Sequence, residues 1–194
     1  MANLPGVKEY TIQWYITRFS DARDRAISFC QPISEPLFIQ RPAEDRWSIA
    51  ECYSHLNEFG EIYLENIRDG LATAPTSSVE NEERPFPPRL LWKGVIKLFA
   101  PPYRLKMKTV KPFSPASKAR LKKQPVLDRF VHLQDAFIDE LTTAWVNSVD
   151  LNKIKVSNPL LKFVRMTLSE SFAVAEVHQR RHIWQAQQVW KQLT

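Results

Sequence analysis

Two long segments that open with the same helix-start signature constrain the fold most strongly. Ser48-Ile49-Ala50-Glu51 and Thr167-Leu168-Ser169-Glu170 are capping boxes, in which the hydroxyl and the glutamate each accept a hydrogen bond from the other residue's backbone amide. After the first box, apolar residues recur at steps of four and three as far as Ile67, which is the period of one buried helix face. We expect helices from Ser48 to about Asp69-Gly70 and from Thr167 to about Leu193.

Two further segments have the same helical spacing. One runs from about Lys8 to Cys30, and the other from about Val126 to Asn147. With only 4 glycines, a turn-rich all-β fold is disfavoured. The sequence therefore predicts an all-α fold, a four-helix bundle with one long crossover between its second and third helices, roughly residues 71–125. The length of 194 residues suits a single domain spanning 1–194.

Smaller signals lie in the connections. RLLWKGVIKLF, residues 89–99, has the pattern of a short basic amphipathic helix. Asn158-Pro159 indicates a helix start or a turn before the last helix.

Two of the four histidines, His178 and His182, stand one helical turn apart near the C-terminus. They fall on the inward face of the last helix, the seam that reads Leu168, Ser171, Ala175, His178, His182, Gln185, Val189. Buried imidazoles lose solvation unless their nitrogens find partners, and a metal ion would take one lone pair from each ring. His55 lies on a strip of the second helix that can face this pair. A chance pairing of histidines on one helix is the plain alternative.

Other polar residues near these positions are given simpler roles. His132 falls off the apolar stripe of the third long helix and is expected at the surface. Cys52, one turn from His55, is interpreted as a small buried thiol rather than a ligand. We expect Glu176 and Arg181 to point sideways, and Gln185 to support a ligand by a hydrogen bond.

These motifs resemble those of a known superfamily. RWSIAECYSHLNEFGEIYL, residues 46–64, resembles the second-helix signature W-S-x-x-E-x-x-x-H-L of the DinB-like (YfiT-type) metalloproteins, and HQRRHIWQ resembles their fourth-helix signature H-x-x-R-H-x-x-Q. MKTVKPFSPAS and VSNPL are similar to connectors of one branch. The resemblance implies a four-helix bundle that binds a divalent metal through His55, His178 and His182. Assigned activities in that superfamily include thiol S-transferases and isomerases that use low-molecular-weight thiols.

Three neutral imidazoles and an open position would activate either a bound water or a bound thiol. Zinc and nickel both accept imidazole ligands. A thiol S-transferase is favoured, and a metal-dependent hydrolase stays open as the alternative. Neither Glu51, which has a capping role, nor Glu58 is identifiable as a general base. The chain contains no Ser-His-Asp motif and no Gly-rich phosphate loop that would offer a competing chemistry.

A basic block distinguishes the crossover from the rest of the chain. Residues 84–123 contain no Asp or Glu, although the whole chain has a net charge of only +6. The cations of the block are Arg84, Arg89, Lys93, Lys97, Arg104, Lys106, Lys108, Lys111, Lys118, Arg120, Lys122 and Lys123. They could hold the carboxylates of an anionic thiol over the metal. In a non-enzymatic metal-binding protein, they could instead contact a membrane surface or nucleic acid.

Expectations about partners and location are broader. We expect a small-molecule substrate and leave a homodimer open. The start of the chain lacks a basic region followed by an apolar run, and Cys30 and Cys52 lack CxxC spacing. A cytoplasmic protein is therefore the expectation.

Overall fold

Four long helices form the body of the protein. The computed structural model describes residues 7–75, 84–102, 114 and 121–194. The long helices are α1 (Ile12–Cys30), α3 (Ile49–Ala72), α5 (Lys123–Val146) and α6 (Leu168–Leu193). Contacts join α1 to α5 and α6, and α3 to α5 and α6, so the four close into a bundle. The predicted all-α four-helix bundle is confirmed. Among the described residues, no helix is both long and apolar enough to cross a membrane.

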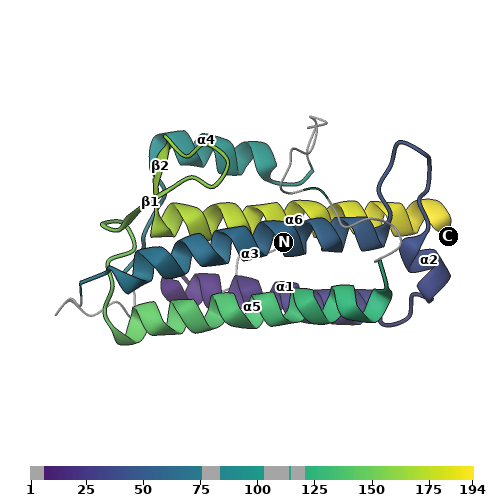
Figure 1. The fold of residues 1–194 in the computed structure, drawn as a ribbon, viewed down its shortest axis with the longest axis horizontal. Helices are drawn as coiled ribbons and strands as arrows, with labels where there is room; N and C mark the ends of the chain where they lie inside the picture. The colour runs from purple at the N-terminus through teal and green to yellow at the C-terminus, as the bar shows by residue number, and fades with distance from the viewer. Residues whose placement is uncertain (1–6, 76–83, 103–113, 115–120) are drawn as a thin grey trace.

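The direction of the helices explains the long crossover. In Figure 1, α1 and α6 run one way along the bundle, and α3 and α5 run the other way. Because α3 and α5 are parallel, the chain must return along the whole bundle before α5 can begin. The short helix α4 (Leu90–Phe99) lies within this return and packs on α6, and the short helix α2 (Glu35–Ile39) lies at one end of the bundle. The basic helix expected at residues 89–99 is therefore present.

Helix ends follow local chemistry. Both predicted capping boxes form, at Ser48 with Glu51 and at Thr167 with Glu170. The first helix begins at Ile12 rather than at Lys8, because the Thr11 side chain caps it by accepting from the amide of Trp14.

The third long helix begins earlier than expected. It starts at Lys123 instead of Val126. Pro125 is tolerated in the first turn, where a backbone amide would lack a helical partner in any case.

Gly70 does not end the second long helix. The helix continues to Ala72, and Gly70 is buried within it. A Cβ atom at Gly70 would lie 2.7 Å from Val156 Cγ1 and 2.8 Å from Leu168 Cδ2. The glycine therefore permits a close approach of other elements to α3 rather than a helix stop.

A small antiparallel hairpin precedes the last helix, and the sequence did not predict it. Strand β1 (Lys155–Ser157) pairs with β2 (Arg165–Thr167), with Val156 opposite Met166. Asn158 forms the turn by accepting from the amides of Leu160 and Leu161 at 3.0 and 2.8 Å. Asn158-Pro159 is thus a turn signal, and no helix starts there.

The apolar core consists of two clusters that meet where α3 and α6 face each other. On α3 one cluster reaches Leu56 and the other resumes at Phe59. On α6 the first cluster ends at Val177 and the second resumes at Ile183. His178 and His182 lie in the interruption on α6, and His55 lies directly before Leu56 at the interruption on α3.

Candidate metal centre

The three histidines come together in the interior of the bundle. His55 on α3 and His178 and His182 on α6 are only 4%, 6% and 7% exposed. One nitrogen from each ring lies within 4.8 Å of the others, and no other group of potential metal ligands occurs among the described residues. His55 Nε2 and His178 Nε2 are 2.9 Å apart. The group could hold a metal ion, since ligand nitrogens bind at about 2 Å and so must converge in this way.

The helical seam explains why these side chains converge. His178 and His182 are one turn apart, so both rings leave the same face of α6, and their centroids are 4.6 Å apart. The His55 ring lies 4.5 Å from that of His182 because α3 packs directly against α6. Two regular helices therefore fix all three rings without any loop.

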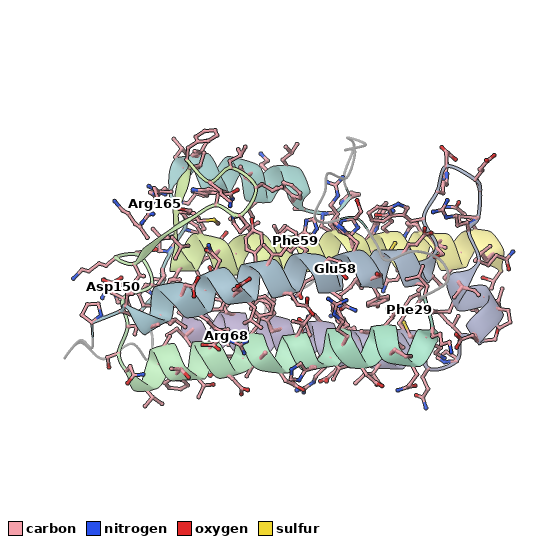
Figure 2. The ribbon with its side chains drawn as sticks, viewed as in Figure 1. Phe29, Glu58, Phe59, Arg68, Asp150 and Arg165 are labelled. Carbon is pink, nitrogen blue, oxygen red and sulfur yellow. The ribbon has the colours of Figure 1, made fainter. Side chains whose placement is uncertain are left out.

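Aromatic rings surround the cluster. Phe59 stacks on His178 with centroids 3.9 Å apart, and it is labelled on α3 in Figure 2. Trp47 lies 5.0 Å from His55 and 5.7 Å from His182. Phe99, at the end of α4, lies 5.6 Å from His178. These rings keep water from much of the cluster and restrict the rotation of the imidazoles.

Burial makes the histidines ready to act as ligands. It lowers the pKa of His178 well below its usual value, and the nearby Arg181 charge and the repulsion that the protonated rings would exert on one another lower it further. Burial likewise lowers the pKa of His182. Both rings are therefore neutral near pH 7, the form that binds metals.

The hydrogen bonding of two imidazole nitrogens bears on whether the cluster suits a metal ion. His178 Nδ1 and His182 Nδ1 are buried, and neither has a hydrogen-bond partner in the described part of the structure. A neutral imidazole carries its proton on one nitrogen and its lone pair on the other, so a proton on Nδ1 of His178 leaves the lone pair on Nε2, the nitrogen that meets His55, for a cation. The polar groups present thus suit a cation with an affinity for imidazole.

Charged neighbours divide into two kinds. Glu176 faces away from the rings, with Arg180 Nε 2.8 Å and Arg18 Nε 3.8 Å from its Oε1. Arg181 was expected to point sideways too, but it is buried, and its guanidinium carbon lies 5.5 Å from the centroid of Phe99. Its charge lowers the pKa of both histidines on α6, so a fixed cation stands beside the candidate site.

The remaining candidates take the following positions. A side-chain hydrogen bond between His182 and Gln185 raises the pKa of His182 against the larger, lowering effect of burial. Cys52 is buried and lies outside the group that could hold a metal. His132 is exposed on α5, as expected. Cations 104–111 and 118–120, and nearly all of MKTVKPFSPAS, lie outside the described residues.

Some residues at the site were missed by the sequence analysis. Trp47 stands at the head of the W-S motif, so its position beside a histidine motif was the available signal. Phe99 and Arg181 had no comparable signal, because their contact depends on how α4 folds back over α6.

Comparison with known proteins gives one finding. The sequence profile of the DinB superfamily matches residues 18–186, which is most of the chain and includes all three histidines. No curated protein and no solved structure matches the chain.

Proposed function

The chain belongs to the DinB superfamily, and from this premise we propose that it is a divalent-metal-dependent enzyme that transfers a low-molecular-weight thiol to an electrophilic small molecule. The observation that carries the proposal is the convergence of three buried histidine nitrogens within 4.8 Å. His55, His178 and His182 are the proposed ligands, with zinc or nickel as the ion. Gln185 would orient the His182 ring.

The thiol must come from outside the protein. Burial raises the pKa of Cys30 to about 12 and raises that of Cys52 still more. Both are buried in the apolar core, so neither can serve as the thiolate. A divalent ion held by His55, His178 and His182 would supply the missing activation, because a cation lowers the pKa of a bound thiol. The sulfur would form a bond to carbon as the carbon–chlorine or carbon–oxygen bond breaks; chloride would leave with the electron pair while the thiol proton goes to solvent, or the opened epoxide oxygen would keep the pair and take a proton.

Transfer is favoured over hydrolysis by the engagement of the nearby carboxylates. Glu51 accepts from Arg41 and from the amide of Ser48. Glu58 pairs with Arg129 at 2.7 Å. Hydrolysis usually needs a general base to guide the proton of water, whereas a thiol bound to a cation releases its proton without one. Hydrolysis remains the alternative outcome of the experiment.

The positive surroundings also suit a thiol that carries carboxylates. Arg181 is fixed beside the histidines and, with a divalent ion, would leave this part of the site strongly cationic. We therefore expect anionic thiols to bind more tightly than neutral thiols of the same size.

Metal content tests the ligand assignment. The purified protein should carry close to one divalent ion per chain, and His178→Ala should lose most of it, because two remaining imidazoles bind far more weakly. His132→Ala is the matched control, since it removes an exposed histidine from another helix. Full metal content in His178→Ala would refute the proposed site.

Cobalt substitution tests the reaction class. Addition of a panel of low-molecular-weight thiols to the cobalt form should give sulfur-to-metal charge-transfer bands, and turnover of a chlorinated arene or an epoxide should then follow. If no thiol perturbs the spectrum while esters or amides are cleaved in a metal-dependent way, the protein is a hydrolase instead. If neither occurs, the enzyme proposal fails while the metal site stands.

A further inference from the structure

Helix α4 is apolar on two opposite faces. Its inner face packs against the core through Trp92 and Ile96. On its outer face, the side chains of Leu90, Leu91 and Leu98 are 87%, 68% and 45% exposed. A helix that is apolar on both sides normally has both sides covered. The inner face is accounted for by the bundle, so the outer face calls for a separate explanation.

The turn of the β-hairpin adds a second exposed apolar stretch. Leu160, Leu161 and Phe163 are 45%, 51% and 84% exposed. Arg89, which precedes α4, donates to the Arg165 carbonyl at 2.9 Å and so joins the start of α4 to the hairpin. Figure 1 shows both elements on the outer side of α6. We call Leu90, Leu91, Leu98, Leu160, Leu161 and Phe163 the α4–hairpin surface.

The charged residues of the two segments that carry this surface have one sign. Residues 84–102 and 151–169 contain no Asp or Glu. Lys93 and Lys97 are exposed and lie on one flank of the stripe from Leu90 to Leu98, as the 100° step of a helix requires. Lys162 and Arg165 add exposed cations from the hairpin, and Arg165 is labelled there in Figure 2. The occupant of the surface should therefore be both apolar and anionic.

This combination selects among possible occupants. A second copy of the chain would bring the same cations into opposition, and like charges in close contact repel. A nucleic acid would satisfy the cations but would leave six exposed apolar side chains without a matching partner. An anionic lipid surface offers phosphates at the level of the lysines and hydrocarbon directly beneath.

We propose that the α4–hairpin surface docks on an anionic membrane, with its leucines and Phe163 entering the interface and the flanking cations facing lipid phosphates. The docking is peripheral, since no described helix can cross a bilayer. It does not depend on the proposed metal chemistry, because the candidate metal centre lies behind the inner face of α4, where Phe99 contacts His178.

Vesicle flotation with the full-length protein tests the proposal. Binding should be strong to vesicles of phosphatidylcholine with phosphatidylglycerol and weak to phosphatidylcholine alone. Leu90→Ser combined with Phe163→Ser should reduce binding by about tenfold or more, because the two apolar side chains that would enter the lipid are lost. Val146→Ser is the matched control, since Val146 is 77% exposed at the end of α5.

Charge and salt separate the two contributions. Lys93→Gln with Lys97→Gln should weaken the preference for anionic vesicles, and part of the wild-type binding should persist at high salt, because apolar burial is not screened. All the replaced side chains are exposed, and a thermal melt checks that each variant is folded. Should the double serine variant melt early, Leu91→Glu provides an independent test.

Three results would overturn the proposal. The first is a folded wild-type protein that does not bind anionic vesicles. The second is vesicle binding that the serine substitutions leave unchanged, since charge alone would then account for it. The third is a dimer, or a nucleic-acid complex, that forms without vesicle binding and is lost on substitution of the same surface.

Discussion

The histidine cluster and the α4–hairpin surface depart from ordinary burial in opposite directions. The cluster places three polar rings in the interior, each under 8% exposed, while the surface places Leu90 and Phe163 in solvent at 87% and 84%. Solitary exposed apolar residues are common, but a group of six beside one helix is not, and neither is a buried group of three imidazoles. These two departures are the reason we propose a bound partner at each region, a metal ion in the cluster and a lipid surface at the α4–hairpin surface.

A single short helix separates the two regions. The C-terminal end of α4 contacts the cluster through Phe99. At its N-terminal end, Arg89 Nε donates at 2.8 Å to Glu170, whose side chain is fully buried. Burial alone would raise the pKa of Glu170, but hydrogen bonds from Arg89 and from backbone amides outweigh this effect and lower it. The carboxylate is therefore charged, and the start of α4 is held in place by an ion pair between buried Glu170 and half-exposed Arg89.

Acidification of the metal-free protein should produce the largest change in stability, because it protonates the buried histidines of the cluster and not the α4–hairpin surface. Burial lowers the pKa of His178 and of His182 well below 6.5 in the folded chain. Below about pH 6.5 the unfolded chain then binds more protons than the folded chain, so the free energy of unfolding falls as the pH decreases. Urea unfolding at several pH values in the presence of a chelator measures this slope.

Substitution locates the origin of the slope. His178→Gln with His182→Gln removes both buried titrating groups, so the decline on the acid side should become much shallower. His132→Gln, at the exposed histidine, should retain the full decline. An equally steep decline in the double variant would show that other groups cause the acid sensitivity.

Gly70→Ala should have the next largest effect, because it adds volume to a closed interior. The new methyl group would lie less than 3 Å from side-chain atoms of Val156 and Leu168. Overpacking of this kind costs about 1–3 kcal/mol, which the better helix propensity of alanine offsets by about 1 kcal/mol. Chemical denaturation should show net destabilisation, and Val156→Ala in the same chain should relieve part of it. A stabilised single variant would contradict the close approach.

Much of the fold and of the candidate site follows from local signals. The two capping boxes and the apolar seams place α3 and α6 correctly, since both depend on residues within one or two turns of each other. The spacing of His178 and His182 puts both on one face for the same reason. The approach of His55 required the further premise that α3 faces α6, which the structure bears out.

The remaining features depend on contacts between distant parts of the chain. Gly70 resembles a helix stop until Val156 is seen against it. The contact of Phe99 with Arg181 joins residues that are far apart in sequence. The hairpin strands have three residues each, too few for a pattern of alternation to be recognised. Sequence periodicity reports which face of a helix is buried, but not which partner covers it.

Gly94→Ala should have the smallest effect, and the opposite sign to Gly70→Ala. A Cβ atom at Gly94 would meet no other atom within 4 Å, so the same change that overfills the interior adds only a solvent-facing methyl group on α4. Alanine favours the helix by about 0.5–1 kcal/mol over glycine, so a thermal melt should show unchanged or slightly raised stability. The methyl group would lie between Leu90 and Leu98 on the outer stripe, so vesicle binding should be kept or modestly strengthened. Weaker vesicle binding by a folded Gly94→Ala protein would indicate that this face of α4 does not meet the lipid. The assignment of the α4–hairpin surface as a docking surface would then be wrong.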